Sequence, residues 1–340
     1  MRIAILTRPD FRSPRVLADS LKLQLEKEEV QVEIFDSINI LNRMVSFRNS
    51  KLSFHFWLKR KLINYFSDWT KIKKLKNFDA IVVSECAPNG FFKQLYNVEK
   101  LKERVKKPIG FYEVYYLGNA PTQIQFLEKN NEPLLDRYDF HLSISNVTEI
   151  KGTDSNNWYP IGIKGESWNL KPLQKKEIIA IIDFEFPGNE KIRKIQINAL
   201  NKAGIKYISL ESSYTIIEIR KIYQQGAIYF MQSFEAFGLP ILECLCSGCQ
   251  IFTQESWWPM SWRINANPQI HGGGTLPECF TVYHNEEQLV KELKAFKDNY
   301  DLVVSPSKIF EIFLAHYPNF FLGNNAEMKR LIYCLKNHFR

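Results

Sequence analysis

The sequence lacks several features that mark common classes of protein. No stretch of its 340 residues approaches the roughly 18 consecutive apolar residues of a membrane-spanning helix. The apolar run at the N-terminus, within MRIAILTRPD, is too short for a secretory signal and indicates a first strand instead. No G-x-G-x-x-G fingerprint of a dinucleotide site follows that strand. We therefore expect a cytoplasmic chain that does not span a membrane and does not bind a dinucleotide in the usual way.

Cysteine is scarce, and its spacing is not typical of secreted disulfide scaffolds. The six cysteines are therefore expected to be reduced thiols. Cys244, Cys246 and Cys249 lie close together with His271 and Cys279 downstream, and these are residue types that bind zinc. On a helix, however, Cys244 and Cys246 point to different sides, and cysteine is often simply a small buried residue. We predict no bound metal and no cofactor.

Basic charge is concentrated in one segment. Residues 43–76 hold ten Lys and Arg against one acid, a net charge of +9, so the rest of the chain carries −1 of the total of +8. Aromatic and aliphatic residues are interleaved there with the basic ones. This composition suits an anionic membrane surface, with Trp57, Lys59, Arg60 and Lys61 as the contacts. It equally suits a helix that packs on a sheet and exposes a solvated basic face. Nucleic-acid phosphates are a third partner, but no nucleic-acid-binding motif is present, so we expect none.

Strand and helix patterns alternate along the whole chain. Apolar strands at Arg2–Thr7 and 30–35 flank a helical pattern, which is a βαβ unit. A polar, aperiodic linker at 163–176 interrupts the pattern, and a new apolar strand begins at about residue 177. The length also suits two domains. We predict two doubly wound α/β domains, at 1–165 and 166–322, followed by a C-terminal helix within 323–340.

The most informative stretch is 227–248, which reads as a strand, a glycine turn and a helix. Gly238 permits backbone conformations that other residues resist, and Pro240 suits the first turn of a helix. The N–H groups at such a helix start are suited to an anionic or hydroxyl-rich ligand. Glu235 precedes the turn and Glu243 follows it eight residues later. The sequence therefore predicts a ligand site here, the alternative being an ordinary turn with two surface carboxylates.

These residues carry a resemblance to a known family. The stretch resembles the E-x7-E signature of retaining GT-B glycosyltransferases, family 4 in particular, through Ser233, Glu235, Phe237, Gly238, Leu239, Pro240, Glu243, Ser247 and Gly248. The resemblance implies two Rossmann-like domains facing across a cleft, with the last helix packed back on the first domain. It implies a metal-independent enzyme that moves a sugar, with retention of configuration, from a nucleotide-sugar donor to a glycan or lipid-linked acceptor. Such an enzyme would work at the inner face of the membrane.

The resemblance also implies roles for the residues of the motif. Glu243 would hold the ribose hydroxyls of the donor, since one carboxylate offers two acceptor oxygens to a vicinal diol. Glu235 would lie against the donor sugar and is a candidate catalytic residue. Backbone N–H groups of Phe237, Gly238 and Leu239 would bind sugar hydroxyls.

The sequence departs from the family pattern at two places. The family's Arg and Lys phosphate clamp has no clear counterpart, and Lys191 and Arg193 are the nearest candidates for donor binding. No histidine follows the strand that ends at Glu113, so Glu113, the second candidate catalytic residue, or Asn119 would take its place. Arg8 and Arg12, in the loop after the first strand, are candidates for an acceptor or a phosphate. The departures leave open a catalytically silent GT-B module that binds sugars or partners, and a further alternative is a nucleic-acid-binding protein that uses the basic segment 43–76.

Overall fold

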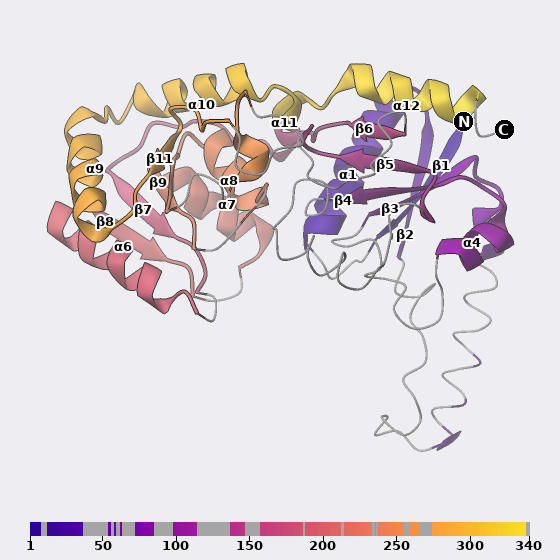
Figure 1. Ribbon diagram of the computed structural model, residues 1–340, viewed down its shortest axis with the longest axis horizontal. Coiled ribbons are helices and arrows are strands. Elements are labelled where there is room, and N and C mark those ends of the chain that lie inside the picture. The colour runs from indigo at the N-terminus through magenta and orange to yellow at the C-terminus, as the bar shows by residue number, and fades with distance from the viewer. Residues whose placement is uncertain are drawn as a thin grey trace.

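Two parallel β-sheets, each with its own helices, organise the chain. The computed structural model describes residues 1–7, 12–36, 54, 55, 58, 62, 72–84, 98–113, 137–146, 157–185, 188–211, 214–232, 235, 237–254, 259–265 and 274–337. Figure 1 shows the two domains side by side, with the last helices running along one edge of both. The prediction of two Rossmann-like α/β domains is confirmed.

The N-terminal sheet has six strands in the order β2-β1-β3-β4-β5-β6. Its strands are β1 (Arg2–Thr7), β2 (Gln31–Asp36), β3 (Ala80–Ser84), β4 (Ile109–Glu113), β5 (Phe140–Ser143) and β6 (Trp158–Pro160), all paired in parallel. The described helices are α1 (Arg12–Lys27) and α4 (Val98–Val105). The four central residues of β1 are fully buried, as expected for a parallel strand covered on both faces.

The C-terminal sheet has five strands in the order β11-β10-β9-β7-β8. These are β7 (Ile179–Ile182), β8 (Lys206–Ser209), β9 (Ile228–Phe230), β10 (Gln250–Thr253) and β11 (Phe280–Val282), again all parallel. Its helices are α6 (Glu190–Ala203), α7 (Ile216–Gln225), α8 (Leu239–Cys246), η4 (Met260–Trp262), α9 (Glu286–Asn299) and α10 (Ser305–His316). Each strand follows a helix or leads into one, which is the arrangement that the alternating pattern predicts.

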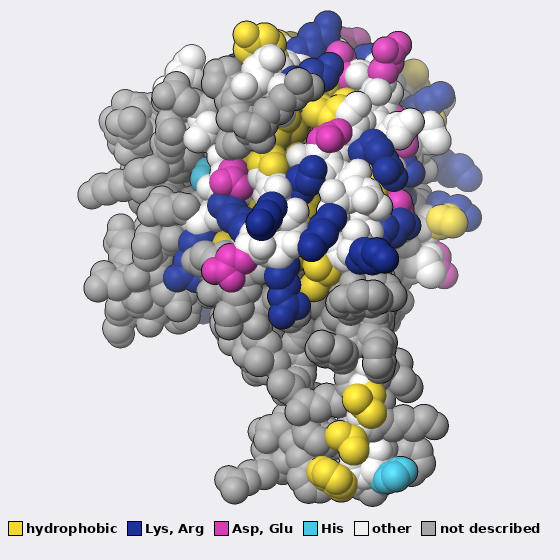
Figure 2. Space-filling model, turned by 90° about the vertical axis from the view of Figure 1, so that its right-hand side faces the viewer, with side chains coloured by type: hydrophobic (Ala, Val, Ile, Leu, Met, Phe, Trp, Pro, Cys, Tyr) yellow, Lys and Arg dark blue, Asp and Glu magenta, His cyan; other side chains and the backbone are white. Residues whose placement is uncertain are grey.

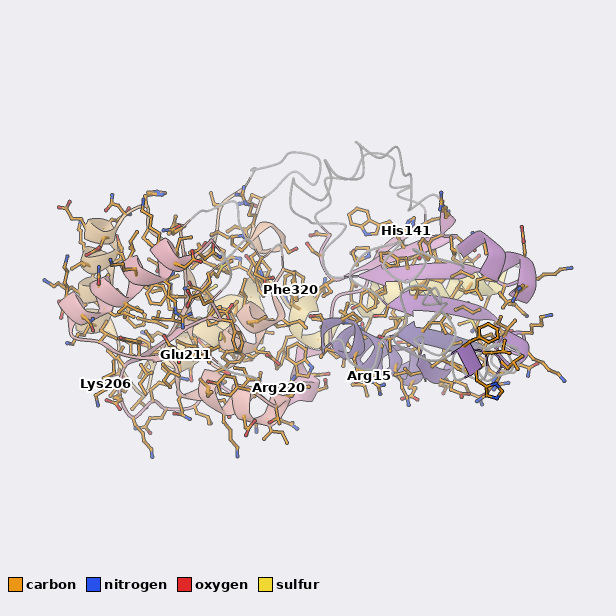
Figure 3. All side chains as sticks on the ribbon, turned by 90° about the horizontal axis from the view of Figure 1, so that it is seen from below. Arg15, His141, Lys206, Glu211, Arg220 and Phe320 are labelled. Atoms are coloured by element: carbon orange, nitrogen blue, oxygen red, sulfur yellow. The ribbon has the colours of Figure 1, made fainter. Side chains whose placement is uncertain are left out.

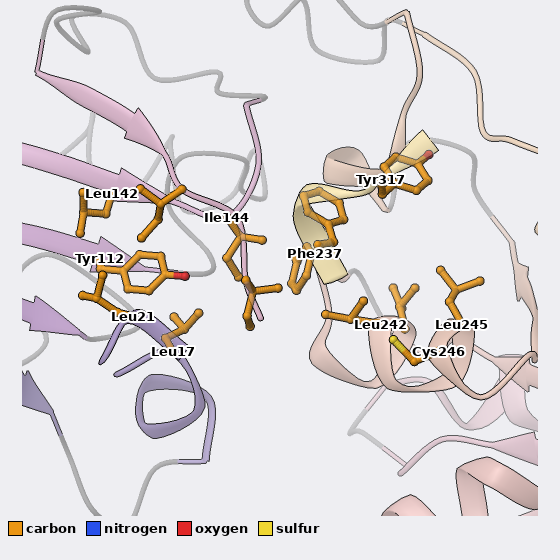
Figure 4. Packing of buried hydrophobic residues seen from close by; sticks show 14 of the residues in the cluster. Leu17, Leu21, Tyr112, Leu142, Ile144, Phe237, Leu242, Leu245, Cys246 and Tyr317 are labelled. Atoms are coloured by element: carbon orange, nitrogen blue, oxygen red, sulfur yellow. The ribbon is translucent and has the colours of Figure 1, made fainter. Parts of the chain in front are cut away.

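A single buried apolar cluster includes residues of both domains. Figure 4 shows Leu17, Tyr112 and Ile144 of the N-terminal domain facing Phe237 and Leu242 of the C-terminal domain. The chain crosses between the domains through the 3-10 helix η3 (Gly165–Trp168). The N–H of Lys164, just before η3, donates to the hydroxyl of Ser20 on α1 at 2.8 Å, and the Tyr112 hydroxyl donates to the Gly162 carbonyl at 2.8 Å. The segment that connects the two domains is therefore held to the N-terminal domain by polar as well as apolar contacts.

The C-terminal segment returns to the N-terminal domain. After α10 come α11 (Asn319–Leu322) and α12 (Asn325–Asn337), and α12 contacts β6 and α1. The Arg330 guanidinium lies 4.2 Å from the centre of the Tyr159 ring. Gly162 has a φ of +68°, and a Cβ there would lie 2.1 Å from the Asn319 carbonyl oxygen, so only glycine allows this close approach. The exact domain boundaries given above stay predictions.

Candidate functional site

The C-terminal sheet has a topological switch point between β7 and β9. The chain leaves β7 for β8 on one side and then returns past β7 to β9 on the other side. Ligands of open α/β sheets bind at the carboxyl ends of the strands at such a point. Asp183 follows β7 directly, and Gln232 and Glu235 follow β9. The predicted ligand stretch therefore lies at the position that the topology favours.

The turn between β9 and α8 has the shape that its glycine predicts. Gly238 is the N-cap of α8, with a φ of +69°, and a Cβ there would lie 2.9 Å from a side-chain carbon of Ile241. Because glycine has no side chain, the N-cap residue cannot cap the first N–H groups of α8. Pro240 stands in the first turn, and Gly248, with a φ of +76°, follows the last turn. This helix start is suited to an anionic or hydroxyl-bearing ligand.

Phe237 anchors the turn in the core rather than presenting its ring to a ligand. The side chain is 1% exposed and stacks on Trp262 with ring centres 5.3 Å apart. The indole N–H of Trp262 donates to the Phe237 carbonyl oxygen, and the Tyr317 hydroxyl donates to the Trp262 carbonyl oxygen. Phe320 meets the Phe237 ring edge-on at 5.0 Å, and it lies where the two domains meet (Figure 3). The position of the turn is thus coupled to the contact between the domains.

Glu243 lies on α8 and forms an ion pair with Arg220 of α7. Arg220 Nε and Glu243 Oε1 are 2.8 Å apart, and the two side chains are 19% and 13% exposed. The Arg220 guanidinium also lies 5.0 Å from the centre of the Trp168 ring, which belongs to η3. Sequence reasoning missed Arg220 because nothing in its own helix marks it; the contact joins residues 23 positions apart. The ribose-binding role of Glu243 stays a prediction.

Two acids stand at the switch point, of which Asp183 is buried and Glu235 is partly buried. Loss of contact with water, and to a smaller extent the charge of Asp183, together raise the pKa of Glu235 to about 7. Burial also raises the pKa of Asp183 to about 6, although hydrogen bonds from Tyr229 and the Phe184 N–H and the charge of Arg193 act in the opposite direction. Buried acids with such raised pKa values are typical of functional sites. Asp183 was not among the predicted site residues, although its place after the first strand of the domain was a signal for it.

The two candidates for a phosphate clamp differ in their surroundings. The Arg193 guanidinium is buried and donates to the carbonyl oxygens of Asp183, at 2.6 Å, and Leu210, at 3.5 Å. It also lies 3.9 Å from the Glu185 carboxylate. Lys191 is exposed in the first turn of α6. Arg193 is therefore engaged in holding the ends of the strands together, whereas Lys191 faces solvent; a donor-binding role for either stays a prediction.

Several predicted site residues fall outside the part of the chain that the structure describes. These are Arg8, Trp57, Lys59, Arg60 and Lys61. Arg12 begins α1 and Glu113 ends β4, at the carboxyl edge of the N-terminal sheet, but their side chains are not described. Among the described residues, no group of three or more His, Cys, Asp or Glu is placed to hold a metal ion. No helix within the described ranges is long and apolar enough to cross a bilayer.

Comparison with known proteins identifies the fold but not a family. No family model matches the sequence, and no curated protein matches it. Solved structures do match. A Listeria monocytogenes protein assigned as a UDP-N-acetylglucosamine 2-epimerase has 13% identity and a TM-score of 0.57, over 99% of this chain and 96% of that one.

Two glycosyltransferases match over the same extent. An alpha-glucosyltransferase in complex with UDP and DNA has 12% identity and a TM-score of 0.56, over 99% of this chain and 100% of that one. The catalytic domain of starch synthase IV from Arabidopsis thaliana, bound to ADP and acarbose, has 10% identity and a TM-score of 0.55, over 99% of both chains. The chain has a GT-B fold. At such low identities the GT-B likeness concerns architecture, and it leaves the family-4 resemblance a prediction.

Proposed function

We propose that this GT-B protein is a glycosyltransferase that moves a sugar from a nucleotide-sugar donor to a glycan or lipid-linked acceptor, with retention of configuration. The observation that carries the proposal is the site at the switch point of the C-terminal sheet. There the partly buried Glu235, with its raised pKa, precedes helix α8, which begins at a glycine, in a motif that resembles the E-x7-E signature. The structural neighbours that hold UDP or ADP support a nucleotide as part of the donor.

Each group of the site has a part in the proposed reaction. The first N–H groups of α8 and the turn at Gly238 bind sugar hydroxyls, and Glu243 takes the ribose hydroxyls. Glu235 lies against the donor sugar. Lys191 and the helix N-termini stabilise the negative charge that develops on the leaving diphosphate, which is preorganised electrostatic stabilisation. The chemistry requires no metal and no cofactor besides the donor.

A second candidate function is supported by the same geometry. Arg193 donates to main-chain carbonyls, and Glu243 is paired with Arg220, so both groups already have protein partners. A module that binds a sugar or nucleotide without transferring it would tolerate these arrangements. The two functions differ in turnover, since only the enzyme releases nucleoside diphosphate from a nucleotide sugar.

Titration with nucleotides tests the proposal. We expect calorimetry to show binding of one nucleoside diphosphate among UDP, GDP and ADP, and slow release of that diphosphate from its sugar conjugate. In Glu235→Gln, which keeps the shape but removes the charge, we expect that release to fall by roughly 100-fold or more. Glu311→Gln, the same change at an exposed position of α10, is the matched control and should behave as wild type. Binding without release favours the silent module, and absence of binding contradicts both.

We further propose that the N-terminal domain docks on an anionic membrane surface, where a lipid-linked acceptor would be found. Phe54, Leu58 and Leu62 recur every four residues and are 57%, 39% and 52% exposed, so they form one apolar stripe at helical spacing. Figure 2 shows apolar side chains on the projecting part and lysine and arginine side chains gathered above them, on the side of α4. Among the described residues of the N-terminal domain, Lys74, Lys76, Arg104 and Lys106 are exposed basic residues.

Flotation with vesicles tests the docking. We expect the protein to float with vesicles that contain phosphatidylglycerol and not with phosphatidylcholine alone, and less so at about 1 M salt, where charges are screened beyond about 3 Å. Changing Phe54, Leu58 and Leu62 to Ser should abolish flotation. Ile217→Ser with Val303→Ser, which removes exposed aliphatic residues from the C-terminal domain, is the control. If both variants float as well as wild type does, the apolar stripe does not dock the protein on the membrane.

A further inference from the structure

We propose that Asp183 binds a hydroxyl group of the transferred sugar, next to Glu235, and so helps to determine which sugar the site accepts. This assignment rests on the proposed function. It concerns a residue that lies outside the E-x7-E motif. The ligand chemistry it requires is a hydrogen-bond donor, such as the hydroxyls that a sugar presents.

The backbone fixes Asp183 at the centre of the switch point. It comes directly after β7, and its N–H donates to the Phe230 carbonyl of β9 at 3.4 Å, which closes the space between the two strand ends. The residue is only 5% exposed. Its charge raises the pKa of Glu235, which follows β9. Two strands of the sheet therefore bring two acids to one point.

Two side-chain acceptor atoms at this point, one of an acid and one of an amide, lack hydrogen-bond donors. In the described part of the chain, Asp183 Oδ1 and Gln232 Oε1 are buried and have no hydrogen-bond partner. The amide N–H groups nearby are already used: Gln196 Nε2 donates to the Met231 carbonyl at 3.2 Å, and Asn189 Nδ2 donates to the Gln232 carbonyl. Buried acceptors without partners are unfavourable and are rare unless a ligand satisfies them. What the site lacks is hydrogen-bond donors.

The charged groups that face Asp183 favour the sugar over the diphosphate. Arg193 directs its hydrogen bonds at main-chain carbonyl oxygens, of which one is that of Asp183 itself. The Tyr229 hydroxyl hydrogen-bonds to the Asp183 carboxyl group. Glu235 adds a second acid from the other strand, and two acids repel a phosphate. A neutral ligand with several hydroxyls meets the unpaired acceptors without this repulsion, and a hydroxyl bonded to a carboxylate is a strong, charge-assisted pair.

The ionisation of Asp183 and Glu235 also predicts a pH dependence of sugar binding, which can be measured in the wild-type protein. Burial raises both pKa values, to about 6 for Asp183 and about 7 for Glu235. A carboxylate is a better acceptor than a protonated carboxyl group. The extra affinity contributed by the sugar should therefore increase as the pH rises from about 5 to about 8, through both pKa values. The affinity for the nucleotide alone should not follow this trend.

The experiment separates the sugar from the nucleotide. Calorimetry would compare UDP with UDP-glucose, UDP-galactose and UDP-N-acetylglucosamine, and GDP with GDP-mannose. In wild type we expect at least one sugar conjugate to bind roughly 10- to 100-fold more tightly than its nucleotide, as one charge-assisted hydrogen bond would give. Asp183→Asn keeps the shape but removes the charge. This variant should bind the sugar conjugate no more tightly than the nucleotide. Its affinity for the nucleotide should stay within about 2-fold of wild type. Asp298→Asn, at an exposed position of α9, is the control.

The outcomes are distinguishable. Equal losses for nucleotide and sugar conjugate in Asp183→Asn would overturn the assignment, as would a wild-type protein that binds both equally. Nucleotide binding that requires added Mg²⁺ in wild type and loses that requirement in Asp183→Asn would show a cation site instead, and would also overturn it. A wild-type protein that binds no nucleotide would contradict the proposed function, and the assignment with it. If Asp183→Asn does not fold, the wild-type protein decides the matter through the pH dependence of the extra affinity that the sugar contributes. If that extra affinity is the same from about pH 5 to about pH 8, a carboxylate does not bind the sugar and the assignment is overturned.

Discussion

Replacing Trp262 by Ala is expected to lower the free energy of unfolding by about 3–5 kcal/mol, the range for deleting a large buried aromatic side chain. Trp262 is fully buried. Its ring lies among those of Phe237, Phe280, Phe313, Tyr317 and Phe320, with ring centres 5.0–6.1 Å away. These rings come from different elements, with Phe280 on β11, Phe313 on α10 and Phe320 on α11, so the cavity cannot collapse without moving these elements. The Phe237 carbonyl would also lose the indole N–H that donates to it.

Urea denaturation measures this effect, and two further variants sharpen it. Trp262→Phe keeps an aromatic ring and loses the N–H, so we expect a smaller loss, of about 1–2 kcal/mol. Tyr333→Ala, at a side chain that is 64% exposed, should change stability by less than about 0.5 kcal/mol. Since Trp262 holds the turn at Phe237, we also expect Trp262→Ala to weaken nucleotide binding at temperatures where it is still folded. A loss of less than about 1 kcal/mol would mean that the cluster does not support the fold as described.

Replacing Glu243 by Ala is expected to weaken nucleotide binding by roughly 100-fold, since two hydroxyl groups of the ribose would lose a charged acceptor. It should also lower the free energy of unfolding by about 2 kcal/mol, because Arg220 would lose its partner in a partly buried place. The expected effect on stability is smaller than for a fully buried ion pair, because the Glu243 side chain is 13% exposed and the Arg220 side chain is 19% exposed. Calorimetry and urea denaturation measure the two effects separately.

Arg220→Ala is the matched control for Glu243. It breaks the same ion pair and should cost a similar amount of stability, yet it leaves the carboxylate in place. If Glu243 holds the ribose, Arg220→Ala should keep nucleotide affinity within about 3-fold of wild type. Equal losses of affinity in both variants would show that the pair acts only as a structural link between α7 and α8. Unchanged affinity in Glu243→Ala would contradict the ribose assignment.

The local structure of the motif followed from the sequence. Gly238 predicted an unusual backbone conformation, and its φ is +69°. The apolar residues Ile241, Leu242 and Leu245 predicted the buried face of a helix, and all three are buried in α8. These predictions succeed because they depend on backbone sterics and on the spacing of apolar side chains, which neighbouring residues alone determine.

The partners of the charged side chains did not follow from the sequence. Arg193 was a candidate for binding the donor, but it is buried against main-chain carbonyls. Glu243 was expected to bind the ribose, which stays a prediction, and the structure pairs it with Arg220. Asp183 and Glu235 are 52 residues apart in the numbering and come to the same edge of the sheet only because they follow the adjacent strands β7 and β9. A sequence shows that a charge is present, but not which charges the fold brings within reach of it.

The sequence by itself thus determined two α/β domains, a strand–turn–helix at 227–248 and a pair of acids around it. The tertiary structure alone decided that the turn is anchored through Phe237 to the contact between the domains, and that a further acid, Asp183, lies at the same switch point as Glu235. The division has a physical reason. Secondary structure depends on periodicity and backbone conformation within a few residues, whereas a site depends on the order of strands in a sheet and on the packing of residues far apart in the chain.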